Sequence, residues 1–219
     1  MGDQQRKSER WQKYWDKHSK SYDRQMGLFD RALFRDDRDW VCAQAAGDVL
    51  EVAVGTGRNL AHYPAAAQLT GVEFSPQMLA IARSTAAELC REITLVEGDA
   101  QALDFPDASF DTVVCTYGLC CIPDEERAVA EIWRVLRPGG LLVLADHVAG
   151  SSRAVRAVQR ALEVLTVSQG GEHFRRRPLA TARAAGFQIV HSDRFTLGIV
   201  ERLAARKPAN AGVRHTAVS

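Results

Sequence analysis

Short apolar runs and helix-like stretches alternate along the chain from residue 48 onward. Runs rich in β-branched residues predict five strands, at 48–54, 67–74, 92–98, 110–118 and 140–148. Stretches with helical spacing predict helices at 58–62, 75–90, 124–136, 151–165 and 177–185. Because strands that alternate with helices in this way form open parallel sheets, the pattern predicts an α/β fold with a Rossmann-like, doubly wound sheet.

The last apolar stretch, FQIVHSDRFTLGIVERLAARK (187–207), predicts two more strands with only a few residues between them. Neighbouring strands joined by so short a connection run antiparallel. We therefore expect a sheet of seven strands that is mostly parallel and ends in an antiparallel hairpin.

The first 40 residues differ in character from the rest of the chain. Large apolar side chains recur there at helical spacing: Trp11, Tyr14, Trp15, and then Phe29, Leu33, Phe34. The spacing predicts two amphipathic helices whose aromatic faces either cover the core or line a ligand pocket. We divide the chain into an N-terminal helical cap or lid (1–40), a main α/β domain (41–207) and a flexible tail (208–219).

Composition narrows the classes of function. The chain has 219 residues, of which 46% are hydrophobic and 25% charged, as in one globular domain of ordinary size. Lys and Arg number 28 against 27 Asp and Glu, so there is no overall basic charge to favour nucleic-acid binding. No apolar run approaches the ~20 residues of a membrane span, and the N-terminus lacks a signal-peptide core, so we expect a cytoplasmic protein.

Five cysteines are spread over the chain without CxxC spacing, and Cys120 and Cys121 are adjacent. This arrangement suits neither a disulfide framework nor a zinc site. We expect all five cysteines to be reduced and the protein to hold no metal.

A two-glycine turn follows the first predicted strand, within VLEVAVGTGRNL (49–60). Gly55 and Gly57 allow the backbone to approach a ligand closely, although a plain structural turn has the same residues. A dinucleotide fingerprint that starts at Gly55 needs a small residue at position 60, where this chain has Leu60. Hydride transfer with a nicotinamide cofactor is therefore disfavoured.

Acidic residues end or follow the first three strands, at Glu51, Glu73 and Asp99. In a doubly wound sheet the ligand lies beyond these strand ends. Glu73 is placed to accept hydrogen bonds from both hydroxyls of a ribose, and Asp99, beside Ala100, to accept one from an exocyclic amine. A single acid at a strand end is often only a solvated cap, but three in succession favour a nucleotide-like ligand.

Together these segments resemble the class I S-adenosylmethionine-dependent methyltransferases. The resemblance rests on VLEVAVGTGRNL (49–60), GVEFSPQMLAIAR (71–83), EGDAQALDFPDASFDTVVCTYGL (97–119) and EIWRVLRPGGLLVLADHV (131–148). It is nearest to the small-molecule branch, which includes ubiquinone and menaquinone methylases, phosphatidylethanolamine N-methyltransferases and thiol S-methyltransferases. The resemblance implies S-adenosylmethionine as cofactor and a small-molecule acceptor as the partner, with no nucleic acid.

The resemblance also implies a role for each matching position. Cofactor-binding residues would be Tyr22, Glu51, Ala53, Gly55, Gly57, Glu73, Phe74, Met78, Asp99, Ala100, Thr116, Tyr117 and Gly118. Tyr22 resembles a tyrosine that closes over the cofactor carboxylate, although a partly buried helix aromatic would give the same pattern. The chain departs from the family at Ala53, where glycine is commoner. Alanine costs little there if its φ is negative.

Methyl transfer needs alignment and exclusion of water more than a protein nucleophile. Candidates for a catalytic role are His147, His173 and Tyr117, and a base matters only for an acceptor that must lose a proton. The basic triplet Arg175–Arg177 either binds an anionic acceptor or is a solvated charge run. Two alternatives stay open: an RNA or protein methyltransferase, and a non-enzymatic nucleotide-binding module.

Overall fold

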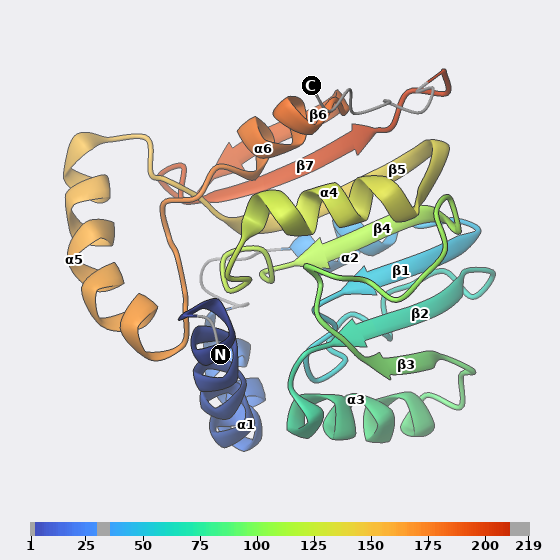
Figure 1. Cartoon of the computed structure of the whole chain (residues 1–219), viewed down its shortest axis with the longest axis horizontal. Helices are drawn as coiled ribbons and strands as arrows, with labels where there is room; N and C mark the ends of the chain where they lie inside the picture. Colours follow the sequence, from blue (N-terminus) through green and yellow to red (C-terminus); the bar gives the residue numbers. More distant parts are fainter. Residues whose placement is uncertain (1–2, 30–35, 211–219) are drawn as a thin grey trace.

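The computed structural model describes residues 3–29 and 36–210. Its elements, in chain order, are α1 (Asp3–Phe29), α2 (Asp37–Cys42), β1 (Asp48–Val52), β2 (Gln68–Glu73), α3 (Pro76–Glu88), β3 (Thr94–Glu97), β4 (Phe110–Thr116), α4 (Glu125–Val135), β5 (Leu136–His147), α5 (Arg153–Gln169), α6 (Pro178–Ala185), β6 (Gln188–Phe195) and β7 (Val200–Arg206). The seven strands form one sheet in the order β3-β2-β1-β4-β5-β7-β6 (Figure 1).

Strands β1 to β5 pair in parallel, whereas β7 is antiparallel to both β5 and β6. The predicted doubly wound sheet of seven strands with an antiparallel terminal hairpin is therefore confirmed. The chain winds outward from β1 to β3, then crosses back to β4 and continues the other way. The carboxyl ends of β1 and β4 thus form the topological switch point, where ligands bind in such sheets.

Neighbouring residues of the central strands point to opposite faces of the sheet, and both faces are buried. Leu50, Val113 and Leu142 pack with helices α4 and α6. The next or preceding residues, Val49, Val114 and Val143, pack with Val41 and Cys42 of α2 on the other face. Burial of both faces explains why the strands are continuous apolar runs.

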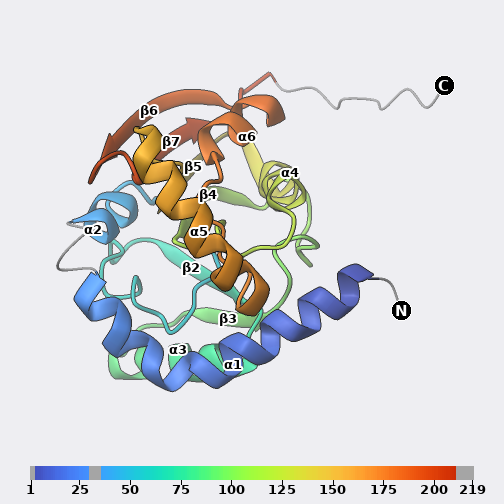
Figure 2. The ribbon, with the colours of Figure 1, turned by 90° about the vertical axis from the view of Figure 1, so that its left-hand side faces the viewer.

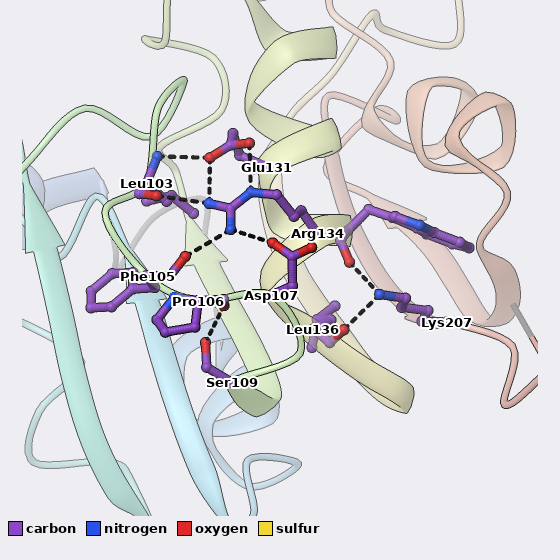
Figure 3. A network of polar contacts seen from close by, with 10 residues as sticks. Leu103, Phe105, Pro106, Asp107, Ser109, Glu131, Arg134, Leu136 and Lys207 are labelled. Carbon is purple, nitrogen blue, oxygen red and sulfur yellow. Dashed lines mark hydrogen bonds and ion pairs between the residues drawn. The ribbon is translucent and has the colours of Figure 1, made fainter. Parts of the chain in front are cut away.

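Helix α4 is anchored at its C-terminal end by two buried or half-buried cations (Figure 3). Arg134 donates hydrogen bonds to the carbonyls of Leu103 and Phe105 at 2.7 Å each and forms ion pairs with Glu131 and Asp107. This network fixes the loop between β3 and β4. Lys207 donates to the carbonyls of Trp133 and Leu136 at 2.7 Å, which satisfies free carbonyls at the helix end.

The prediction of a helix at residues 58–62 is wrong, because this segment forms a series of turns. Gly57, with φ +85°, lies close to α3, since an added Cβ would be 3.3 Å from Thr85 of that helix; it would also be 2.8 Å from the Leu60 side chain. Leu60 is buried against Leu79 and Ala82 of α3. The turn therefore packs on α3 through a large side chain instead of starting a helix of its own.

Helices α1 and α2 take the place of the two predicted N-terminal helices. Trp11, Tyr14 and Trp15 lie on α1, as expected. The second predicted helix, around Phe29, Leu33 and Phe34, falls largely outside the described residues. Helix α2 crosses the expected boundary at residue 40, since its last two residues belong to the core.

All five cysteines are free thiols, as predicted. None of the described helices combines the length and apolar composition that a transmembrane helix needs.

Candidate functional site

A cavity opens at the switch point, beyond the carboxyl ends of β1, β2 and β4. It collects residues from α1, α2, the β1–β2 loop and the loops after β3 and β4. The residues predicted for cofactor binding that line it are Tyr22, Glu51, Ala53, Gly55, Glu73, Phe74, Met78, Asp99, Ala100, Thr116, Tyr117 and Gly118. Gly57 is not among the residues that line the cavity, because its tight approach is to α3. Its expected place beside the cofactor is therefore not supported.

The floor of the cavity is made of backbone at the ends of β1 and β4. Ala53 has φ +56°, in the left-handed region, so the condition under which alanine costs little, a negative φ, is not met. This backbone conformation suits glycine, and in alanine it is strained because the Cβ comes close to the following carbonyl oxygen. Gly55, with φ +60°, has open space on its Cβ side, since an added Cβ would meet no described atom within 4 Å. A ligand can therefore approach the backbone at Gly55 closely.

Glu51 is a buried carboxyl group at the end of β1. Its Oε1 accepts a hydrogen bond from Asn59 Nδ2 at 2.8 Å, and the same amide donates to Thr116 Oγ1 at 2.9 Å. Only 4% of the residue is exposed, and this desolvation raises the pKa of Glu51 to about 7. A cationic ligand in the cavity would favour the ionised carboxylate.

Glu73, at the end of β2, is held by two backbone donors. Its Oε1 accepts from Ser75 N at 2.8 Å and its Oε2 from Gly55 N at 2.9 Å. Burial raises the pKa of Glu73, and these backbone hydrogen bonds oppose that rise. Since each carboxylate oxygen accepts more than one hydrogen bond, the group keeps acceptor capacity for a ligand in the cavity.

Asp99, after β3, is oriented in a similar way by its neighbour Gln101. The Gln101 side chain donates to both carboxylate oxygens, at 2.9 and 3.0 Å, and its backbone N–H donates to Oδ1 at 2.9 Å. The three strand-end acids Glu51, Glu73 and Asp99 therefore share one cavity, as the sequence predicted.

Helix α1 provides an aromatic wall through Trp11, Trp15 and Tyr22. It is tied to the β2–α3 loop by Gln12 Nε2, which donates to the Phe74 carbonyl at 2.8 Å, and by Asp16, which accepts from Ser75 Oγ at 2.5 Å. These contacts hold α1 at the wall of the cavity. Figure 2 shows α1 running beside α3.

Nearer the carboxyl end of α1, Asp23 accepts a hydrogen bond from Thr56 Oγ1 at 2.6 Å. Thr56 lies in the turn after β1 and also lines the cavity. Both ends of the cavity wall formed by α1 are thus attached to the main domain by polar contacts.

Tyr117 lines the cavity but does not present a free hydroxyl. Its O–H donates a hydrogen bond to Asp37 of α2, whose carboxylate also accepts from Arg202 of β7. Burial and the neighbouring Asp37 raise the pKa of Tyr117. The geometry makes Tyr117 a wall residue whose hydroxyl is bonded to Asp37, and its catalytic role stays a prediction.

Neither candidate histidine is among the described residues that line the cavity. His147 packs its ring on Tyr117 and Phe174, with centroids 5.1 and 5.7 Å apart, and burial lowers its pKa to about 4. His173 lies in a neighbouring hollow and donates its backbone N–H to Cys120 O at 2.9 Å. Burial also lowers the pKa of His173. A general-base role for either histidine is therefore not supported.

The cysteine pair and the basic triplet have separate positions. Cys121 lines the cavity, whereas Cys120 is buried behind it, with the two Sγ atoms 3.5 Å apart. Arg175 pairs with Glu163, and Arg176 donates to the Pro123 carbonyl at 3.1 Å. The alternative that the triplet binds an anionic acceptor is not supported, since none of its arginines is among the described residues that line the cavity.

Sequence reasoning missed Arg38, which lines the cavity from α2. Its guanidinium donates to Asn59 Oδ1 at 2.8 Å and lies 5.8 Å from the centre of the Tyr117 ring. No local pattern marks Arg38, because it reaches the cavity only through the packing of α2 on β4 and β5. A lone arginine in a charged stretch is otherwise typical of an exposed surface.

The fold is a doubly wound α/β sheet with a cavity at its switch point, and comparison with known proteins identifies its family. Residues 50–144 match the model of a methyltransferase domain. A phosphatidylethanolamine N-methyltransferase from Cereibacter sphaeroides is 44% identical over 118 residues, which are 53% of this chain and 58% of that protein. A demethylmenaquinone methyltransferase from Deinococcus radiodurans is 38% identical over 171 residues, 73% of this chain and 69% of that protein.

Among solved structures, a possible histamine N-methyltransferase from Thermotoga maritima superposes with a TM-score of 0.68 at 24% identity, over 89% of this chain and 98% of that one. The chain belongs to the class I S-adenosylmethionine-dependent methyltransferases. It spans 58% of the length of the first of these relatives. Family membership implies S-adenosylmethionine as the methyl donor.

The residues of the cavity fit this donor. The open Cβ side of Gly55 leaves room for a bound group against the backbone. The buried carboxyl of Glu51 suits the positive charge of the donor, and the oriented carboxylates of Glu73 and Asp99 suit its hydroxyl and amino groups.

Proposed function

We propose that this protein transfers the methyl group of S-adenosylmethionine to a small, largely apolar acceptor of the thiol, amine, phenol or quinone type. The observation that carries the proposal is the composition of one cavity. Carboxylates from three successive strand ends line it together with apolar side chains of α1 and of the loop after β4: Trp11, Trp15, Cys121, Ile122 and Pro123. The acids serve the cofactor and the apolar group serves the acceptor.

In this proposal the cofactor lies along the ends of β1 to β4. Glu73 accepts hydrogen bonds from the ribose hydroxyls, and Asp99 with the Ala100 backbone binds the adenine edge. Phe74 and Met78 pack on the adenine ring. Arg38 and Tyr22, which both line the cavity, donate hydrogen bonds to the cofactor carboxylate, and Glu51 accepts from its ammonium group.

Methyl transfer requires the acceptor atom to be aligned with the methyl–sulfur bond of the cofactor. When bound, S-adenosylmethionine supplies an electrophilic methyl group on a positively charged sulfur. Residues Thr116–Gly118 line the sulfonium of the cofactor, Cys121 borders the acceptor opposite the methyl group, and α1 excludes water. Neither candidate histidine lines the cavity, and the Tyr117 hydroxyl is bonded to Asp37. In this proposal the acceptor therefore reacts as a free amine, or as a thiol, phenol or reduced quinone that loses its proton to solvent.

The acceptor names of the relatives agree with this class. The relatives described above are named for a phospholipid amine and for a quinone. These names describe those proteins, and they support an acceptor with a large apolar part for this chain.

A screen for consumption of S-adenosylmethionine tests the proposal. Purified protein is incubated with thiols, phenols, amines and quinones in their reduced, quinol form, and each product is identified by its mass. We expect one of these classes to gain a single methyl group with an equal amount of S-adenosylhomocysteine. Turnover on RNA or a protein without turnover on any small acceptor would contradict the proposal.

A further inference from the structure

Helix α5 turns its polar side chains toward the protein and its apolar side chains outward. Gln159 and Glu163 are each only 7% exposed. The large apolar residues are exposed instead: Val158 by 60%, Leu162 by 49%, Val164 by 71% and Leu165 by 62%. A surface helix of a globular protein ordinarily has the opposite arrangement. Figures 1 and 2 show α5 on the outside of the molecule, away from the sheet.

Polar contacts fix this orientation. Gln159 Nε2 donates to the carbonyls of Val148 and Phe174 at 2.9 and 3.0 Å, and Gln159 Oε1 accepts from Gly150 N at 2.8 Å. Glu163 accepts from the backbone N–H of Arg175 at 2.9 Å and pairs with its guanidinium at 2.5 Å. Rotating the helix to bury its apolar side would break all of these hydrogen bonds, so the outward apolar face is a built feature.

The exposed charges of α5 are all positive. Arg153, Arg156 and Arg160 are exposed, and Glu163, the one acidic residue in the helix sequence, is buried and paired. At 100° per residue, Arg153 and Arg160 lie along one border of the outward face, next to Val164. Val158, Leu162 and Leu165 lie on the other side of a strip of alanines, Ala154 and Ala161.

We propose that the outward face of α5 binds the surface of a phospholipid bilayer that contains anionic lipids. Val158, Leu162 and Leu165 enter the boundary between headgroups and acyl chains, while Arg153 and Arg160 contact the lipid phosphates. An apolar helix face bordered by basic residues is the pattern of a helix that lies in the membrane interface. Near its carboxyl end, α5 borders a hollow that shares Trp11 and Pro123 with the cavity, so bilayer and site lie on one side of the protein.

Vesicle binding tests this proposal without any methyl acceptor. The full chain is sedimented with vesicles of phosphatidylcholine and phosphatidylglycerol, and with vesicles of phosphatidylcholine alone. We expect stronger binding to the anionic vesicles. The double variant L162S/L165S should bind them at least about tenfold more weakly. The charge-reversal variant R153E/R160E should lose the preference for anionic vesicles and the salt dependence.

Val190 provides a control, since it is 60% exposed and lies near the start of β6, whereas the turn at the other end of the hairpin contacts Ser151, just before α5. V190S should bind vesicles as the wild type does. Failure of the wild type to bind, or a folded L162S/L165S variant that binds equally well, would overturn the proposal. A wild-type dimer that L162S/L165S converts to a monomer, without vesicle binding, would assign the face to a second copy of the chain. None of these outcomes bears on the proposed methyl transfer in solution, which the cofactor-consumption screen tests separately.

Discussion

Ala53 and Gly118 face each other at the switch point of the sheet, where a Cβ on Gly118 would lie 2.8 Å from the Cβ of Ala53. Ala53 follows β1 with φ +56°, and Gly118 follows β4. The family position at which glycine is commoner is occupied here by alanine, and the neighbouring glycine makes the room that its methyl group needs. The floor of the cavity depends on this pair.

The Ala53–Gly118 pair predicts coupled effects on stability. A53G removes the strain of a positive φ and should raise the free energy of unfolding by about 0.5–1 kcal/mol after the entropy cost of glycine. G118A should lower it by about 1–3 kcal/mol, because its Cβ would be 2.8 Å from both Ala53 and Cys115 Sγ. Denaturant unfolding of both variants and the double variant measures this. Strict additivity in the double variant would contradict a direct contact.

Helix α1 is predicted to act as a lid. Removing residues 1–23 deletes the cavity-lining aromatic residues together with the polar contacts that Gln12, Asp16 and Asp23 make to the main domain. The remaining sheet and core should stay folded and lose most of the turnover, as measured by circular dichroism and a methyl-transfer assay. A truncated protein that melts at a much lower temperature while binding the cofactor normally would show that α1 is structural packing instead.

Glu51 predicts a pH dependence of stability in the cofactor-free protein. Its folded pKa is raised from 4.5 to about 7, so the folded state holds a proton there that the unfolded state has released. The contribution of Glu51 to stability therefore falls as pH rises from about 4.5 to 7, by about 3 kcal/mol in total. E51Q removes this dependence. Unfolding free energies of the two proteins at pH 5 and pH 8 measure it, and a constant difference between them would contradict the raised pKa.

The same group predicts proton release when the cofactor binds. A cation beside Glu51 lowers its pKa, so at pH 7 the wild type should release up to about half a proton more than E51Q. Calorimetry of S-adenosylmethionine binding in two buffers of different ionisation enthalpy measures the difference. Equal release by both proteins would place the positive charge of the cofactor away from Glu51.

The positions of the two histidines predict that the pH dependence of methyl transfer is set by the pKa of the acceptor and not by a histidine of the protein. His147 has a pKa of about 4 and lies behind Tyr117, and His173 lies outside the cavity lining. H147A and H173A should therefore change turnover by less than about tenfold, and the pH–rate profile should follow the pKa of the acceptor. A loss of about 100-fold in either variant, with unchanged cofactor affinity, would establish a histidine base.

The sequence predicts the sheet well because apolar runs, and the short connection before β7, report directly on strand type and direction. It also predicts the strand-end acids, since parallel strands bring their carboxyl ends to one edge. Backbone conformation and packing are less accessible. The positive φ of Ala53 depends on the room that Gly118 leaves, and the tight turn at Gly57 depends on contact with α3. The position of Arg38 depends on how α2 packs on β4 and β5. Each depends on residues distant in the sequence.

Glu73 is the residue on which the assignment of the cavity most directly depends. It lies at the end of β2, lines the cavity and is oriented by Gly55 and Ser75. Glu97 is a matched control, because it pairs with Glu73 as the last residue of the adjacent strand β3, is exposed, and is not among the described residues that line the cavity.

The decisive measurement is calorimetric titration of S-adenosylhomocysteine into the wild type, E73A and E97A. We predict that the wild type binds one equivalent, that E73A binds more weakly by about 1–3 kcal/mol through the loss of charge-assisted hydrogen bonds, and that E97A binds as the wild type does. Equal affinity of E73A and the wild type, in proteins with the same melting temperature, would contradict the placement of the cofactor at the switch point.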